Sequence, residues 1–365
     1  MAKVKDIVRH LESIAPPAYQ ESYDNASLIT GNPGMEVTGV LCTLDCIESV
    51  VEEAIERDCN LIVAHHPIVF KGLKQLNGKN YVERTVIKAL KNDIAIYAIH
   101  TNLDNVAVGV NKMIADRLGL TKLQILSPKK QTLQKLVTFI PVEATEAVMG
   151  EVHKAGAGNI GNYSDCSFRV TGTGTFKPND VANPTIGQPG ELEEVNEHRV
   201  EVIYPAHLEA RILQALKQAH PYEEVAYYIQ ALENKNQEVG SGMIGQLPIE
   251  MTNNEFLFYL KEKMDLNTIR YTEKSGEKVK KVAVCGGAGS FLLGKAKGKG
   301  ADAFVTADFK YHEFFDAEGE IMIADIGHYE SEVHTKALLH SFLTEKFPNI
   351  ATYLSEVDTN PVKYF

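Results

Sequence analysis

Short apolar runs alternate with stretches of helical periodicity between Val37 and Leu120. The apolar runs are VTGVLCTLD, NLIVAHHP and AIYAIHTNLD, and the helical stretches that follow them are CIESVVEEAIERDC, YVERTVIKALKNDI and GVNKMIADRLGL. A β-α-β-α-β-α order with strands that are apolar along their whole length is typical of a mostly parallel sheet covered by helices on both faces. The pattern therefore predicts an α/β fold for this part of the chain.

The C-terminal part of the chain repeats this arrangement. Its apolar runs are KVAVCGGAG, DAFVTADF and IMIADIGH, and its polar or helical stretches are GSFLLGKAKGKGA, HEFFDAEGE and YESEVHTKALLHSFLTEKF. We therefore predict two similar α/β halves, residues 1–129 and 241–365, that together form one domain.

The segment between the halves, residues 130–240, has a different character. It reads as a strand (LVTFIP), a helix and a strand (SFRVTGTGTFKP), followed by a second strand (RVEVIYP), the helix AHLEARILQALKQAHP and the strand EEVAYYIQAL. Two consecutive β-α-β units are the ferredoxin-like pattern. We predict an inserted ferredoxin-like α+β domain, with irregular surface structure in the Gly-, Pro- and Asn-rich stretch GTFKPNDVANPTIGQPGELEEV.

Composition excludes several classes of protein. The net charge of −11 over 365 residues argues against a general nucleic-acid binder, which depends on clustered Lys and Arg. Five cysteines, an odd number without C-x-x-C spacing, indicate reduced thiols and a reducing compartment. The N-terminal sequence lacks the features of a signal peptide, and no apolar run approaches the roughly 18 residues that span a membrane. We therefore expect a cytoplasmic protein that does not enter the membrane.

Two apolar runs in the first half end in residues of the types that bind metals. NLIVAHHP ends in His65 and His66, and AIYAIHTNLD carries His100, Asn102 and Asp104 at or just past its end. Ligand sites in open α/β sheets form at the carboxyl ends of the strands. Neighbouring strands are therefore expected to deliver these nitrogen and oxygen atoms to one edge of the sheet.

The second half supplies a histidine and a carboxylate in the same kind of place. His328 ends the run IMIADIGH, and Glu332 follows at the i+4 position on the same helix face. Imidazole and carboxylate groups favour Zn, Mn, Fe or Ni over Ca or Mg, and a carboxylate can bridge two ions. A single histidine at a strand end often serves only as a capping or hydrogen-bonding residue. Five such residues at three strand ends favour a metal site instead: His65, His66, Asp104, His328 and Glu332.

Several longer strings resemble one known family. IVAHHPIVF, HTNLDNVAVGVN, GAGNIGNYSDCSF and GHYESE, with YDNASLITG near the start, are similar to the Nif-three-like family, also labelled GTP cyclohydrolase type 2-like, over nearly the whole chain. The family motif W-D-N-x-G-L departs here to Tyr23-Asp24-Asn25-Ala26-Ser27-Leu28, and the chain contains no Trp. The departure loosens the local match and leaves the metal argument unchanged.

The resemblance carries expectations about the site and the assembly. It implies two divalent ions per chain, a ring-shaped homohexamer and a CutA-like or PII-like identity for the insertion at 130–240, which includes HPYEEVAYYI. The identity of the metal stays open among Zn, Fe, Mn and Ni. Carried over position by position, the ligands are His65, His66, Asp104, His328 and Glu332, with Glu332 as the bridge between the ions.

For several other residues the sequence allows more than one role. His312, in TADFKYHEFFDA, could donate a proton or contact substrate, or could be a packing histidine. Asp308 and Lys310 could serve an anionic substrate or be ordinary solvated charges. The GGAGS segment at 286–290 could place backbone N–H groups around a phosphate, although a tight strand-to-helix turn explains it better. We attribute His220 and Cys285 to the fold.

Two functions of different classes are compatible with this sequence. The first is a metal-dependent hydrolase that acts on a nucleotide-like or phosphate-bearing substrate; the family label suggests GTP ring opening, but no purine pocket is specified by the sequence. The second is a non-enzymatic, oligomeric metal-binding or regulatory protein whose insertion senses a small molecule or docks a partner. An open coordination position at the metal distinguishes the two, because catalysis requires one.

Overall fold

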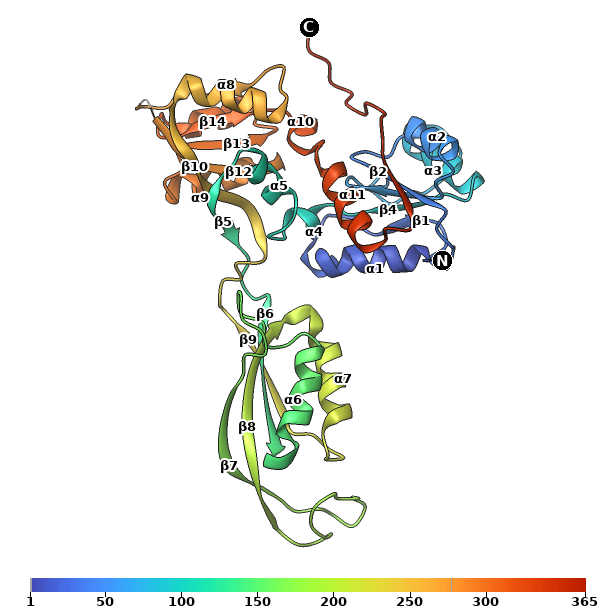
Figure 1. The fold of residues 1–365 in the computed structure, drawn as a ribbon, viewed down its shortest axis with the longest axis vertical. Helices are drawn as coiled ribbons and strands as arrows, with labels where there is room; N and C mark the ends of the chain where they lie inside the picture. Colours follow the sequence, from blue (N-terminus) through green and yellow to red (C-terminus); the bar gives the residue numbers. More distant parts are fainter. Residues whose placement is uncertain (1, 277) are drawn as a thin grey trace. The chain divides into compact units, whose positions relative to one another are not determined.

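The structure, a computed structural model, describes residues 2–276 and 278–365. The chain forms two compact units: a first unit that contains the residues up to Pro128 together with Gln237–Phe365, and a second unit, Lys129–Asn236. Figure 1 shows the path of the chain through both. The sequence prediction places the second boundary at 240, whereas Val239 lies in the core of the first unit and pairs with Val106.

The first sheet of the first unit contains the strand that directly precedes His65 and His66. Its strands lie in the order β1, β4, β3, β2, β15; β2, β3, β4 and β15 are parallel, and β1 is antiparallel to β4. The strands β2, β3 and β4 are buried along their whole length, as their apolar sequences predict. The bounds are β1 Leu28–Thr30, β2 Gly39–Thr43, β3 Leu61–Ala64, β4 Ala95–Ala98 and β15 Ala351–Leu354.

The second sheet of the first unit carries the C-terminal strands. Its order is β11, β14, β13, β12, β10, β5, in which β12, β13 and β14 are parallel and β10 is antiparallel to both β12 and β5. The parallel strands again have their carboxyl ends at one edge of the sheet. The bounds are β5 Thr121–Pro128, β10 Gly240–Thr252, β11 Arg270–Tyr271, β12 Lys278–Ala288, β13 Ala303–Ala307 and β14 Met322–Asp325.

One hydrophobic core joins the two sheets of the first unit. It includes Val63 and Tyr97 from the first sheet, Ile114 from a helix, and Val282 and Val305 from the second sheet.

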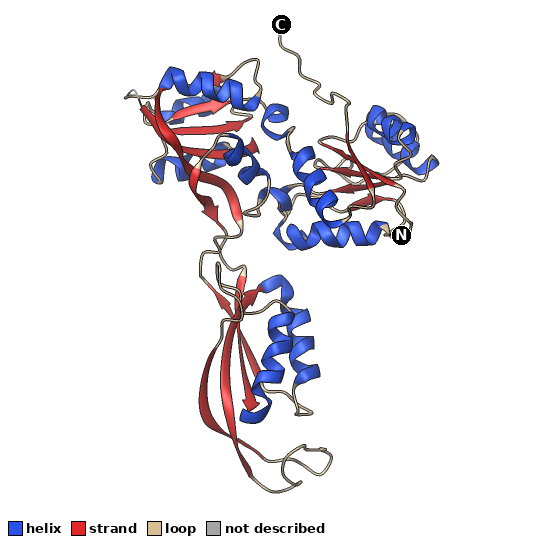
Figure 2. Cartoon of the chain, viewed as in Figure 1, coloured by secondary structure: helices blue, strands red, loops and turns tan. Residues whose placement is uncertain are grey.

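The helices are coloured blue in Figure 2. Their bounds are α1 Val4–Ile14, α2 Glu48–Glu56, α3 Tyr81–Lys91, α4 Thr101–Asp104, α5 Val110–Arg117, α8 Asn253–Met264, α9 Leu293–Gly298, α10 His328–Glu332 and α11 Thr335–Lys346, with the 3₁₀ helices η1 Pro17–Tyr19, η4 Ser290–Leu292 and η5 Tyr311–Ala317.

The second unit packs two helices on one antiparallel sheet. Its strands lie in the order β7, β8, β6, β9. Helices α6 and α7 lie side by side (Figure 1), and Val148, Val152, Ile212 and Leu216 on them are buried in a core shared with Leu136. The bounds are β6 Leu133–Pro141, η2 Val142–Ala144, α6 Thr145–Lys154, β7 Phe168–Phe176, β8 Glu193–Pro205, η3 Ala206–Leu208, α7 Glu209–Ala219 and β9 Tyr227–Leu232.

The mixed α/β class expected from the sequence is confirmed by these sheets and helices. Across residues 2–276 and 278–365, no helix has both the length and the apolar character needed to cross a membrane.

Removal of the second unit is expected to leave the first unit folded. Pro128 at the end of β5 pairs with Gly240 at the start of β10, so a short Gly/Ser linker in place of Lys129–Asn236 can join strands that are already neighbours. We expect this deletion variant to melt cooperatively and to bind as much metal per chain as the full protein, as measured by calorimetry and elemental analysis. A folded variant that no longer binds metal would mean that the second unit completes the site.

Candidate metal centre

The carboxyl ends of β3 and β4 bring three histidines together. His65 and His66 directly follow β3, and His100 precedes the short helix α4, which ends at Asp104. The rings of His65 and His66 have their centroids 4.9 Å apart, and the ring of His100 lies 5.3 Å from that of His65. Because β3 and β4 are adjacent and parallel, the side chains that follow them meet at one edge of the sheet.

Helix α10 contributes the residues from the second sheet. It follows β14, begins at His328 and ends at Glu332, so the two side chains lie one turn apart on one face. Glu332 is only 3% exposed. Its Oε2 lies 3.0 Å from Nε2 of His66 and 3.1 Å from Nε2 of His328. Its Oε1 lies 3.9 Å from Nε2 of His65.

The ligand-type atoms fall into groups that share Glu332. One group is His65, Asp104 and Glu332, and another is His66, His328 and Glu332; within each group the atoms lie within 4.8 Å of one another. A further group of the same size consists of His65, His66 and His100. All the residues that the sequence prediction names as metal ligands are therefore brought together, and each of the described groups could hold a metal ion.

Each of the four histidines at the centre makes a hydrogen bond through its Nδ1 atom. The acceptors are a backbone carbonyl or a carboxylate, so Nδ1–H donates and Nε2 is left to face the centre. This arrangement fixes the orientation of the ring before any metal arrives. The pairs are His65 with the carbonyl of Ile99 (2.8 Å), His66 with Asp45 (2.7 Å), His100 with Asp24 (2.8 Å) and His328 with Asp308 (2.7 Å).

Two buried polar atoms at the centre have no hydrogen-bond partner. They are Nε2 of His65 and Oδ1 of Asp104, which lie 3.6 Å apart. A buried polar atom without a partner costs free energy, and such atoms are rare in folded proteins. A divalent ion is the partner that suits a neutral imidazole nitrogen beside a carboxylate oxygen, so the residues present fit a metal ion.

Hydrogen bonds and charges at the centre shift the pKa values of Glu332 and of the two histidines that face it. Burial opposes the charge on His66 and His328, but hydrogen bonds to Asp45, Asp308 and Glu332 outweigh it and raise the pKa of His66 to about 9 and that of His328 to about 11. Burial opposes ionisation of Glu332 as well, but its hydrogen bonds to the two histidines hold its pKa below the usual value.

Burial disfavours charge on the other side of the cluster, at His65 and Asp104. Burial lowers the pKa of His65 to about 3, so its imidazole is neutral at pH 7 and its Nε2 lone pair is available. Burial and the charge of Glu332 raise the pKa of Asp104. In the metal-free protein the positive charges therefore lie on His66 and His328, beside the Glu332 carboxylate.

Two glycines beside Glu332 have no Cβ atoms, which leaves room for its carboxylate. A Cβ atom on Gly287, whose φ is +59°, would lie 2.7 Å from Oε1 of Glu332, and one on Gly286 would lie 3.3 Å from it. The backbone N–H groups of Gly286 and Gly287 donate to Asn111 (3.0 Å) and Ser331 (2.9 Å). These two N–H groups are thus already used within the protein, and Gly287 is joined to α10 by its bond to Ser331.

Sequence reasoning left out several residues of the centre. The sequence prediction names His100 as a strand-end residue but not as a ligand. Asp45 lies two residues past the end of β2, within reach of the same strand-end rule. Asp24 lies in the YDNASL segment, and only the resemblance drew attention to that segment. Asp308 is not a free charge, since it accepts the hydrogen bond from His328.

Three other residues named in the sequence analysis are not among the proposed ligands. His312 is exposed and contacts the rings of Tyr311 and Phe315; it belongs to none of the potential metal-binding groups among the described residues. Cys285 is buried, and its thiol donates to the carbonyl of Gly286. His220 is buried in the second unit, where it bonds backbone atoms.

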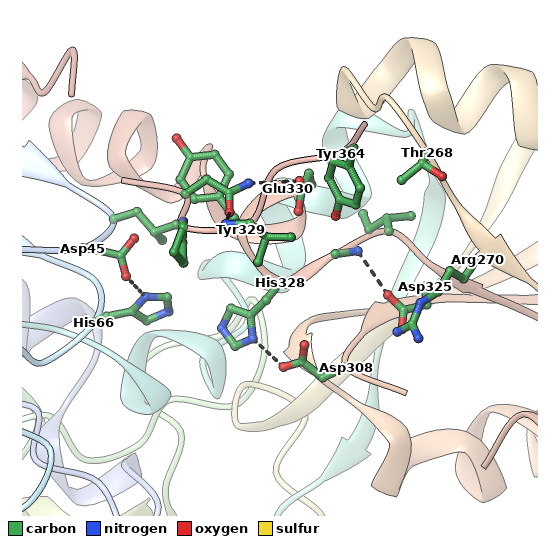
Figure 3. Close-up of a pocket in the computed structure, with 16 residues that line it drawn as sticks. Asp45, His66, Thr268, Arg270, Asp308, Asp325, His328, Tyr329, Glu330 and Tyr364 are labelled. Carbon is green, nitrogen blue, oxygen red and sulfur yellow. Dashed lines mark hydrogen bonds and ion pairs between the residues drawn. The ribbon is translucent and has the colours of Figure 1, made fainter. Parts of the chain in front are cut away.

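A cavity of about 500 Å³ lies beside the centre in the first unit. Figure 3 shows His66 and His328 at this cavity, hydrogen-bonded to Asp45 and Asp308. The cavity wall also contains Tyr329, Tyr364 and Arg270, and the guanidinium of Arg270 pairs with Asp325. A small molecule in the cavity would therefore touch two of the histidines of the centre as well as aromatic and cationic groups.

Known proteins resemble this chain over its whole length, as its sequence motifs indicate. A Bacillus subtilis (strain 168) protein named GTP cyclohydrolase 1 type 2 homolog is 40% identical over 365 residues, which cover 99% of this chain and 98% of that protein. The crystal structure of a Bacillus cereus protein related to NIF3 is 39% identical with a TM-score of 0.88, and a Staphylococcus aureus structure is 31% identical with a TM-score of 0.79; each comparison covers 100% of this chain and 99% of the other. The chain belongs to the Duf34/NIF3 (NGG1p interacting factor 3) family, which matches its residues 2–361.

Proposed function

We propose that the chain binds two divalent metal ions at His65, His66, Asp104, His328 and Glu332, with Glu332 as the bridge. The observation that carries this proposal is the position of the Glu332 carboxylate: Oε1 faces His65, while Oε2 faces His66 and His328. A carboxylate whose two oxygens face different groups of ligands is suited to hold two ions close together. The donor set of imidazole and carboxylate favours Zn, Fe, Mn or Ni.

We propose further that the chain is a metal-dependent hydrolase of a nucleotide-like or phosphate-bearing substrate. Two bound divalent ions supply a Lewis acid and lower the pKa of a bound water to about 7. Asp45 and Asp308 hold the rings of His66 and His328 in fixed orientations, and Arg270 supplies a cation to the wall of the adjacent cavity. The names of the curated relatives agree with this class of substrate. A proton-transfer role for His312 stays a prediction.

We also propose that the second unit is an inserted ferredoxin-like domain and that the two sheets of the first unit are halves of one metal-binding domain. The strand order β7, β8, β6, β9, with α6 and α7 between strands in the chain, supports the first part. The core shared by the two sheets supports the second. The homohexamer and the cytoplasmic location expected from the sequence stay predictions.

Replacement of Glu332 by Gln is expected to remove at least one ion. The amide keeps the size and helix propensity of the side chain but removes the charge that offsets repulsion between two dications. Glu330→Gln in the same helix should retain both ions, because Glu330 belongs to none of the described potential metal-binding groups. Elemental analysis of metal-saturated protein, freed of excess ions, measures this; equal metal content in the two variants would remove Glu332 from the site.

Metal binding at pH 7 is expected to release about two protons per chain. His66 and His328 have pKa values of about 9 and about 11 in the metal-free protein, so both are protonated at pH 7 and must lose a proton to bind a metal. Metal affinity should therefore rise with pH between 6 and 8. Calorimetric titrations in buffers of different ionisation enthalpy count the protons, and metal uptake without proton release would contradict the assignment of these two ligands.

The hydrolase proposal is tested by a substrate panel. Metal-loaded protein is incubated with GTP and with other nucleoside mono-, di- and triphosphates, and the products are separated by chromatography. We expect turnover of at least one compound, lost on chelation and in Glu332→Gln, because the buried carboxylate holds the metal site together. Absence of metal-dependent turnover across the panel would contradict hydrolysis of this substrate class and favour the non-enzymatic, metal-binding function.

A further inference from the structure

The second unit contains a cavity of its own, with a volume of about 490 Å³. All of its wall belongs to residues 139–228, so it is separate from the proposed metal ligands. Its size is in the range of small-molecule sites. Aromatic rings contribute much of the wall: Phe139 and Tyr228 have ring centroids 5.8 Å apart, as do Phe176 and Tyr222.

The loop after β7 closes one side of this cavity and is tied in place. The backbone N–H of Asn183 donates to the carboxylate of Glu223 at 3.0 Å. The hydroxyl of Thr185 donates to the carbonyl of Pro221 at 2.7 Å. Both bonds join the loop to the segment that follows α7, so the wall is formed before a ligand binds.

Glu197 places an uncompensated negative charge in the cavity wall. It lies on β8 and is only 8% exposed. Among the described residues, no Lys, Arg or His nitrogen forms an ion pair with its carboxylate, although Lys177 lines the same cavity. A buried carboxylate without a cationic partner is costly, and proteins tolerate this cost where a ligand supplies the cation.

His220, which lies close enough to Glu197 to feel its charge, does not supply that cation. Nε2 of His220 donates to the carbonyl of Phe139 (2.9 Å), and its Nδ1 accepts from the backbone N–H of Tyr222 (3.1 Å), which requires the neutral ring. Burial lowers the pKa of His220, in agreement with the neutral form.

The groups closest to Glu197 are a neutral hydroxyl and a glycine. The hydroxyl of Tyr222 is buried against the Glu197 carboxylate, and burial together with this neighbour raises the pKa of Tyr222. A Cβ atom on Gly174 would lie 2.0 Å from Oε2 of Glu197, so this strand position has to be glycine for the carboxylate to lie where it does. The neutral hydroxyl does not offset the charge of the carboxylate, whereas a cationic donor on a ligand would.

We propose that this cavity binds a small organic amine, with its ammonium group against Glu197 and its apolar part between the aromatic rings. Charge-assisted hydrogen bonds to a carboxylate are about twice as strong as neutral ones. Aromatic faces attract cations within about 6 Å of the ring centroid. The combination of a buried anion and several rings selects an amine over an alcohol or an acid of the same shape.

Calorimetric titration of the full chain with three probes of similar shape tests this proposal. The probes are benzylamine, benzyl alcohol and benzoate, which differ in charge. We expect benzylamine to bind at least about tenfold more tightly than benzyl alcohol, and benzoate not to bind, because only the amine neutralises Glu197. Glu197→Gln should reduce benzylamine affinity to that of benzyl alcohol, whereas Glu194→Gln, an exposed residue on the same strand, should leave it unchanged.

A second variant keeps the test independent of how Glu197→Gln folds. Tyr228 is 60% exposed, so Tyr228→Leu should preserve the fold, shown by an unchanged melting temperature, and should weaken benzylamine binding by loss of a ring. No binding of benzylamine, equal affinity for amine and alcohol, tighter binding of benzoate, or unchanged affinity in Glu197→Gln would each overturn the proposal.

Discussion

The buried carboxylate of Glu332 is the constraint on which the first unit depends. A carboxylate that is 3% exposed requires positive partners close to it. His66 arrives from the end of β3 and His328 from the start of α10, and both face the same oxygen. Residues far apart in the chain must therefore meet at one point, and the core shared by the two sheets holds them there.

The same carboxylate explains features of the backbone around it. Gly286 and Gly287 at the end of β12 leave no Cβ atom in the space beside Oε1. The N–H of Gly287 donates to Ser331, the residue before Glu332, so the turn and the helix fix each other. The first two glycines of the Gly-rich segment at 286–290 therefore pack against the carboxylate.

Local sequence patterns predicted the strands and their polar ends because these features depend on neighbouring residues. The apolar runs became β3, β4 and β14, and His65, Asp104, His328 and Glu332 converge as the strand-end rule predicts. Contacts between distant residues could not be predicted in this way. Asp24 bonds His100 from 76 positions away, and the inclusion of Val239 in the first unit depends on its pairing with Val106. Hydropathy patterns carry no information about such partners.

Anomalous X-ray diffraction from crystals of the metal-loaded protein tests the central claim most directly. The account predicts two anomalous peaks per chain, one between His65 and Asp104 and the other between His66 and His328, with the Glu332 carboxylate contacting both. A single peak at full loading, or peaks that the Glu332 carboxylate does not contact, would contradict it.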